Sequence, residues 1–308
     1  MTTKLPLLVV NQSGGKTVFN GSWFRGKHTN FIPSKADLKQ RDALHRFFLK
    51  GLLPESPFVS KDVPITCFGS CFARHLSHYL YERGYKIYGK HLNLHSHIIR
   101  FGEGIVNTFV ILQQLEWALL DKPMPENLWF SKDKEVALVS PEIKQETREI
   151  IQNTQVFVFT LGLSEVWFDK LSGEALWRAV PATLFDPQRH YFRQTTVSEN
   201  AHNIKRIIEL VQEVKPDAQI IFTLSPVPLM ATFRPIPCVI ANSVSKATLR
   251  CALDEALHAT EWSKVHYFPS YEIVMSSPES PFIDDNRHIK PKIVDGVLRT
   301  FEKYFCVT

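Results

Sequence analysis

Two short segments far apart in the chain carry the residue types of an acyl-transfer site. In one of them, Gly69, Ser70 and Cys71 stand between an apolar run and an amphipathic segment, so a hydroxyl and a thiol lie at the start of a predicted helix. In the other, Asp285 and His288 stand in the order Asp-x-x-His just before the last predicted helix. A nucleophile at a helix N-terminus, with an aspartate that orients a histidine, can transfer acyl groups. The sequence therefore indicates an enzyme.

Strands and helices are predicted to alternate around these residues. Apolar runs predict strands at residues 63–68, 86–88, 155–161, 218–224 and 265–268. Amphipathic periods predict helices at residues 72–83, 107–120, 199–214, 242–261 and 291–304. This alternation is typical of an α/β fold with a doubly wound, mostly parallel sheet. Ligands bind at the carboxyl ends of such strands, which three turns follow directly: 69–71, 162–165 and 225–228.

Two parts of the chain fall outside this alternation. Apolar residues show no sustained periodicity in residues 1–62. This predicts an N-terminal extension that packs on a main domain of residues 63–308, with one helix near residues 36–50. Residues 167–196 predict an insertion at the rim of the sheet. A loop of this kind either shapes substrate specificity or covers a sheet edge.

Composition excludes several classes of function. The chain has 308 residues, 44% apolar and 22% charged, which suits one or two globular domains. The net charge is +5 and the pI about 8.9, with both signs interspersed, so an anionic small molecule or a glycan is a better partner than nucleic acid. No apolar stretch suits a signal peptide or a membrane span, so a cytoplasmic location is expected. The five cysteines fit no disulfide framework and are predicted to be free thiols.

Neither a metal nor a tightly bound cofactor is expected. His91, His95 and His97 would share one face of an extended segment, but no cysteine or carboxylate stands nearby at ligand spacing. Gly102 and Gly104 lack the third glycine of a dinucleotide-binding turn.

The first of the two chemical segments is also a family signature. Residues 69–73 read Gly-Ser-Cys-Phe-Ala, the namesake motif of the GSCFA domain family, and the chain resembles that family over most of residues 60–305. Further blocks that carry the resemblance are residues 160–167, 223–232, 241–250, 267–272 and 285–288. The family is similar to the SGNH, or GDSL-like, hydrolases. The resemblance implies a three-layer, flavodoxin-like α/β/α fold and an esterase or carbohydrate O-acyltransferase.

The resemblance leaves the nucleophile open between two neighbours. An ungapped overlay on the Gly-Asp-Ser block of the SGNH pattern places Cys71 on the nucleophile and Ser70 on the aspartate. A shift by one residue makes Ser70 the attacking hydroxyl and Cys71 a small buried hydrophobic residue. The helix dipole and a nearby histidine favour a thiolate, which supports Cys71.

Asp285 and His288 match the last block of the SGNH pattern. The resemblance implies that His288 is the general base and that Asp285 fixes its tautomer. Asp284 is an alternative partner for the imidazole if the loop turns differently. A solvated loop before the last helix is the competing interpretation of this segment.

The expected oxyanion donors depart from the SGNH pattern. Where the pattern has Gly-x-Asn-Asp, this chain has Gly162, Leu163, Ser164 and Glu165, so a shorter hydroxyl donor stands in place of the amide. Gly104 is a candidate for a backbone donor from the second block. Asn107 either replaces the missing asparagine or caps the following helix, which is the commoner role.

Other side chains of the predicted rim could bind substrate. Glu165 and Trp167 follow a buried strand, where Trp167 either stacks on a sugar ring or belongs to the core. Arg74, on the first turn of the helix after Cys71, could bind a phosphate or carboxylate, as could Arg178 in the insertion.

We therefore expect a covalent acyl intermediate and a carbohydrate or polysaccharide precursor as acceptor. Water as acceptor would make the protein an esterase, and a sugar hydroxyl would make it an O-acyltransferase with acyl-CoA as a possible donor. The competing hypothesis is a non-catalytic module that binds a glycan or a protein through the same rim, and the serine at position 164 favours it. The sequence does not set the oligomeric state.

Overall fold

A computed structural model describes the chain over residues 6–12, 15–20, 26–90, 92, 94–101, 105–125, 128–131, 134–136, 139–258, 263–276 and 279–307. It divides into two compact units, Met1–Phe47 and Phe48–Thr308. The first unit holds the antiparallel hairpin of β1 (Pro6–Gln12) and β2 (Gly15–Asn20).

The helix expected near residues 36–50 is replaced by two short turns. They are the 3-10 helix η1 (Asp37–Lys39) and the π-helix η2 (His45–Leu49). The backbone of Gln40 is extended, which ends the first turn and interrupts the helical hydrogen bonds.

The second unit is an α/β fold built on a parallel sheet. Its four strands follow the order β10 (Val265–Tyr267), β9 (Gln219–Leu224), β6 (Val156–Leu161) and β3 (Ile65–Gly69), and all neighbours are parallel. The predicted strand at residues 86–88 is a single parallel bridge from Ile87 to Ile65 at the free edge of β3. With this bridge the order along the chain is 2-1-3-4-5, the flavodoxin-like order. The switch point lies at β3, where that order reverses.

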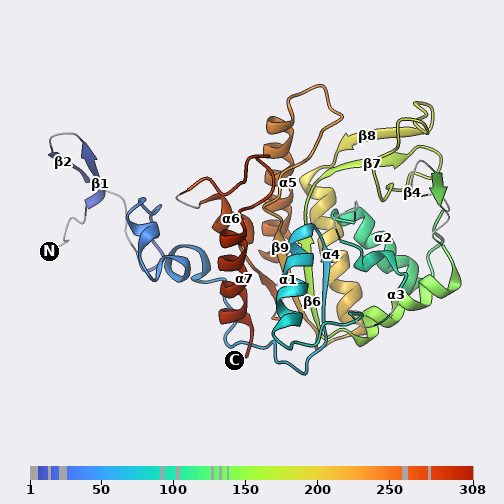
Figure 1. Ribbon diagram of the computed structural model, residues 1–308, viewed down its shortest axis with the longest axis horizontal. Helices are drawn as coiled ribbons and strands as arrows, with labels where there is room; N and C mark the ends of the chain where they lie inside the picture. The colour runs from blue at the N-terminus through green and yellow to red at the C-terminus, as the bar shows by residue number, and fades with distance from the viewer. Residues whose placement is uncertain are drawn as a thin grey trace. The chain divides into compact units, whose positions relative to one another are not determined.

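Helices cover both faces of this sheet (Figure 1). One face packs against α2 (Thr108–Leu120), α3 (Pro141–Asn153), α4 (Val197–Val214) and α5 (Cys238–His258). The other face packs against α1 (Cys71–Glu82), α6 (Ser270–Met275) and α7 (Pro291–Phe305). Successive strand side chains point to opposite faces, so Phe157 and Phe159 join the first core while Val156 and Val158 join the second. The predicted three-layer α/β/α fold is therefore confirmed.

A hairpin follows β6 at the rim of the sheet. Its strands β7 (Glu165–Asp169) and β8 (His190–Gln194) pair antiparallel and enclose most of the insertion expected at residues 167–196. A second small hairpin pairs β4 (Trp129–Ser131) with β5 (Lys134–Val136). No helix within the described ranges has both the length and the apolar character that a membrane span requires.

Gly69 allows the chain to turn sharply from β3 into α1. Its φ is +105°, and a Cβ at this position would lie 2.2 Å from the carbonyl oxygen of Thr160 on β6. Only glycine fits this close approach. Because the turn is so short, the first residues of α1 lie directly at the carboxyl end of β3, beside the switch point of the sheet.

Candidate active site

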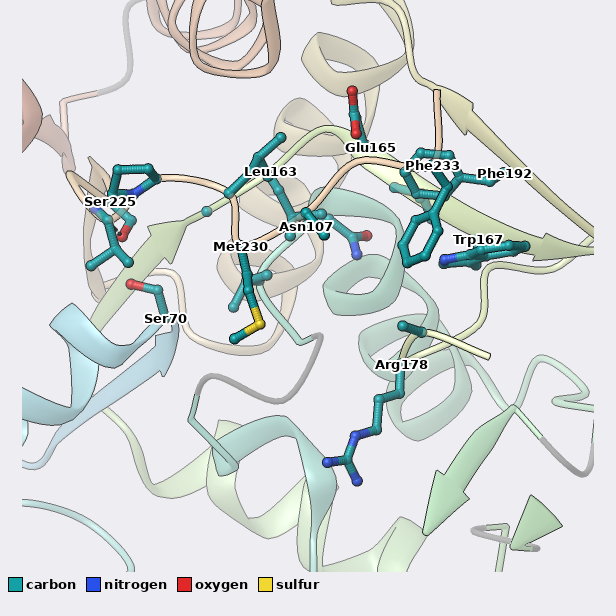
Figure 2. A pocket seen from close by; sticks show the side chains of 18 of the residues that line it. Ser70, Asn107, Leu163, Glu165, Trp167, Arg178, Phe192, Ser225, Met230 and Phe233 are labelled. Atoms are coloured by element: carbon teal, nitrogen blue, oxygen red, sulfur yellow. Dashed lines mark hydrogen bonds between the residues drawn. The ribbon is translucent and has the colours of Figure 1, made fainter. Parts of the chain in front are cut away.

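A cavity of about 410 Å³ opens at the carboxyl ends of the parallel strands. The turns after β3, β6 and β9, which were predicted to share one rim, all line it. Figure 2 shows Ser70 and Ser225 at one end of the cavity, and the rings of Trp167, Phe192 and Phe233 together at the other end. The cavity therefore joins the two nucleophile candidates to an aromatic wall.

Ser70 and Cys71 have different roles at the start of α1. Ser70 is the N-cap, and its Oγ accepts a hydrogen bond of 3.2 Å from the amide of Phe72. Cys71 is the first helical residue, partly exposed, and lines the cavity beside Ser70. The geometry thus gives Ser70 a capping role and places Cys71 beside it on the cavity wall.

Asp285 makes three hydrogen bonds, two of them with His288. Its Oδ1 accepts the amides of Arg287 at 3.0 Å and His288 at 2.9 Å, while its Oδ2 is hydrogen-bonded to Nδ1 of the His288 ring. The ring hydrogen bond is the main cause that lowers the pKa of Asp285 to about 2, and the two amides add to it. An ionised carboxylate only accepts, so Nδ1 carries the proton and Nε2 stays basic. Asp285, rather than Asp284, is the partner of the imidazole.

The loop that carries His288 lies against the first turns of α1. Arg287 lines the same cavity as Cys71. Burial lowers the pKa of His75, one turn beyond Cys71, and the charge of His288 adds to this effect. In this structure neither the Cys71 thiol nor the Ser70 hydroxyl is hydrogen-bonded to His288.

Ser164 does not serve as an oxyanion donor. It is completely buried and does not line the cavity. Its amide donates to Ser245 Oγ at 2.9 Å, its hydroxyl lies 3.2 Å from the oxygens of Ser245, and it accepts from Gln194 Nε2 at 2.6 Å. These bonds join the turn after β6 to α5 and β8. The expectation that this hydroxyl replaces the missing asparagine is corrected, because it points into protein rather than into the cavity.

The remaining oxyanion candidates have mixed outcomes. Asn107 caps α2, since its Oδ1 accepts from the amide of Val110 at 3.0 Å, and it also lines the cavity. Gly162 lines the cavity too, but its amide donates to the carbonyl of Val106 at 2.7 Å. Gly104 lies outside the described residues. The structure therefore commits the Gly162 amide to a structural bond.

The other predicted substrate-binding residues separate into two groups. Glu165 and Trp167 line the cavity, and the Trp167 ring packs with Phe192 and Phe233 at centroid distances of 5.1 and 5.0 Å. Arg74 is exposed on α1 and is not part of the cavity wall. The helix turns its side chain away from the cavity, which corrects the expectation that it binds substrate there.

The described residues contain no cluster of three or more histidine, cysteine or acidic side chains that could hold a metal. His95 pairs with Glu146, and His97 packs against Trp129 and Trp177. His91 lies outside the described residues.

Lys246 is a rim residue to which the sequence analysis assigned no role. It is 2% exposed, and its Nζ donates to the carbonyls of Gly162 at 2.6 Å and of Ser225 and Val227 at 2.8 Å each. These carbonyls belong to the turns after β6 and β9. The ammonium therefore ties together two of the three segments that form the rim. A lysine inside an otherwise amphipathic helix gives no sequence signal for such a role.

Replacing Lys246 with methionine is expected to loosen this rim. Three buried carbonyls would lose their donor, so we expect the free energy of unfolding to fall by about 3 kcal/mol. Burial, with a contribution from Arg287, lowers the pKa of Lys246 from 10.5 to about 7. Between about pH 7 and about pH 10.5 the unfolded chain therefore binds more protons than the folded chain. The free energy of unfolding of the parent rises with pH over this range, and the variant lacks this rise.

Urea unfolding at about pH 7 and about pH 9 measures both effects. Lys264→Met is the matched control, because Lys264 forms an exposed ion pair with Asp217, and its loss should change stability by less than about 1 kcal/mol. Equal urea midpoints for Lys246→Met and the parent would refute the role of Lys246.

The sequence of most of the second unit also matches a known family. The sequence model of the GSCFA family matches residues 64–301, most of the chain. The chain belongs to the GSCFA family. No curated protein matches this GSCFA protein.

Several solved structures resemble the fold of this GSCFA protein. The lipase Lip_vut3 from a goat rumen metagenome is 12% identical, with 79% of this chain and 98% of that chain covered and a TM-score of 0.39. A carbohydrate esterase of family 3 from Talaromyces cellulolyticus is 8% identical, with coverage of 78% and 95% and a TM-score of 0.38. The family 3 carbohydrate esterase of Clostridium thermocellum is 11% identical, with coverage of 79% and 94% and a TM-score of 0.37. Likeness at this level assigns no activity to the GSCFA protein.

Proposed function

We propose that this GSCFA protein is an acyl-transfer enzyme that forms a thioester intermediate on Cys71. The observation that carries the proposal is the placement of Cys71 at the N-terminus of α1, partly exposed and opening on the cavity. The ordered Asp285–His288 pair on the adjacent loop supports it, since Nε2 of His288 is the basic nitrogen. The nucleophile Cys71 lies at the switch point of the fold. The base His288 and its orienting carboxylate, Asp285, lie on the loop before α7.

The reaction would proceed in two steps. Nε2 of His288 takes the proton of the Cys71 thiol, and Sγ attacks the carbonyl carbon of the donor ester or thioester. The leaving oxygen or sulfur departs with the proton from His288, and the acyl group stays on Sγ. An acceptor hydroxyl then loses its proton to His288, attacks the thioester carbonyl and releases Sγ, which regains the proton.

Two groups would stabilise the oxyanion that forms in each step. The amide of Cys71 belongs to the first turn of α1, where N–H groups have no partner within the helix. The carboxamide of Asn107 lines the same cavity. Neither role depends on Ser164.

The acceptor is proposed to be water or a sugar hydroxyl on a carbohydrate precursor. The rings of Trp167, Phe192 and Phe233 form an apolar platform at the end of the cavity away from Ser70, a surface on which a sugar ring can stack (Figure 2). Acyl-CoA is proposed as a donor for the transferase reaction, because exchange between two thioesters needs little driving force.

Incubation of the protein with 4-nitrophenyl acetate tests the proposal. We expect a burst of about one equivalent of nitrophenolate, then slower turnover, because acylation precedes release of the acyl group. Intact-protein mass spectrometry should show a single acetyl adduct. The adduct should also form with acetyl-CoA if a thioester is accepted.

A binding module is the rival function, and the buried position of Ser164 is the observation in its favour. It predicts saturable binding of a glycan without burst, turnover or adduct. That set of results would contradict the enzyme proposal.

A further inference from the structure

We propose that Arg287 makes the nucleophile end of the cavity a site for an anionic group, so that the substrate carries a carboxylate or a phosphate close to the acyl group. The proposal deepens the function proposed above and rests on it for the identity of the cavity as a substrate site. Arg287 stands between the two members of the Asp285–His288 pair and lines the cavity with Cys71. Sequence analysis gave it no role.

The charges on the cavity wall do not balance. The charged side chains among the described lining residues are those of Glu165, Arg178 and Arg287. The charge of Glu165 is balanced by Arg234, since its carboxylate accepts from Arg234 at 3.2 Å and from the hydroxyl of Thr232 at 2.7 Å. The two arginines then leave the cavity with positive charge.

Arg287 has no anionic partner of its own among the residues that the structure describes. Its Nε is buried and makes no hydrogen bond there, and no described carboxylate forms an ion pair with its guanidinium. A buried N–H of a charged group without a partner is costly, and it is commonly satisfied by a ligand. A carboxylate or phosphate matches the fork of a guanidinium through two parallel hydrogen bonds.

The backbone keeps this guanidinium close to the chemistry. Oδ1 of Asp285 accepts the amides of both Arg287 and His288, so the loop that orients the base also fixes the arginine. The charge of Arg287 reaches Lys246, whose pKa it helps to lower. A bound anion would relieve the repulsion between Arg287 and the protonated form of Lys246. Arg178 is held differently, by the carbonyl of Phe130 at 3.2 Å and the ring of Trp129.

Alkylation of Cys71 by iodoacetate and iodoacetamide tests this inference without a known substrate. The two reagents have nearly the same shape, but only iodoacetate is an anion. Peptide mapping gives both rate constants at Cys71 and at Cys251, an exposed thiol on α5 that serves as the internal control. We expect the iodoacetate-to-iodoacetamide rate ratio to be about tenfold higher at Cys71 than at Cys251, because a cation close to the thiol attracts the anionic reagent.

Substitution of the arginine should remove this preference. Arg287→Gln is expected to bring the ratio at Cys71 down about tenfold, and Arg287→Lys should keep part of it. Arg299→Gln, on the exposed side of α7, is the matched control and should leave the ratio unchanged. Protection of Cys71 by millimolar acetate or by inorganic phosphate, lost in Arg287→Gln, then shows which anion fits better.

Three results would overturn the inference: equal ratios at Cys71 and Cys251, an unchanged ratio in Arg287→Gln, or no alkylation of Cys71 by either reagent. The alkylation ratio needs no turnover, so it is independent of the acyl-transfer proposal. A protein that forms the acyl adduct but shows no anion preference loses only the role of Arg287. A protein with the preference but no adduct loses only the catalytic proposal.

Discussion

Replacing Cys71 with alanine is expected to abolish the acyl adduct and to lower kcat/KM for 4-nitrophenyl acetate by about 1000-fold or more. The thiol is the group that would bond to the acyl carbon, and alanine at the first position of α1 offers no nucleophile. Steady-state kinetics and intact-protein mass spectrometry on the parent and the variant measure both effects.

Ser70→Ala and Cys251→Ala are the matched controls for this prediction. Ser70→Ala removes the N-cap of α1 and should cost about 1 kcal/mol of stability, but the adduct should still form. Cys251→Ala removes an exposed thiol and should change neither quantity. Loss of the adduct in Ser70→Ala, with an adduct still present in Cys71→Ala, would move the nucleophile to Ser70.

Asp285→Asn is expected to lower kcat by about 1000- to 10,000-fold while the fold is preserved. An amide in this position can donate to Nδ1 of His288, which moves the ring proton to Nε2 and removes the basic nitrogen. The hydrogen bond to His288 is the main cause that lowers the pKa of Asp285 to about 2. In the parent the carboxylate therefore orients the ring at all pH values well above 2, and this support is lost only as the pH falls towards 2.

Asp284→Asn is the matched control for Asp285→Asn, because Asp284 is an exposed carboxylate one residue away. It should retain parental kcat across the pH range. The pH profiles of kcat/KM for the parent and both variants make the comparison. A full loss of activity in Asp284→Asn with normal activity in Asp285→Asn would reverse the assignment of the orienting residue.

The sheet and the edge that carries the candidate site could be predicted from the sequence because local signals decide them. Continuous apolar runs set β3, β6 and β9 within two residues of their observed ends. The Asp-x-x-His spacing also predicted the pairing of Asp285 with His288, because residues three apart in a tight loop can reach each other. These features depend on neighbours in the sequence.

The features that the sequence did not predict depend on contacts between distant segments. Ser164 was expected to face the substrate, but its environment is set by Ser245 on α5. The role of Lys246 exists only because the turns after β6 and β9 meet around it. That the Nε of Arg287 finds no hydrogen-bond partner among the described residues likewise follows from where its loop packs, which no spacing pattern records.

Identification of the acylated atom tests the central claim most directly. The parent protein is quenched in acid after a brief incubation with 4-nitrophenyl acetate, digested and mapped by mass spectrometry, with and without neutral hydroxylamine, which cleaves thioesters faster than oxygen esters. We expect the acetyl group on Cys71, removed by hydroxylamine. An acetyl group on Ser70 that resists hydroxylamine, or no acetyl group in the peptide that contains both residues, would contradict the account.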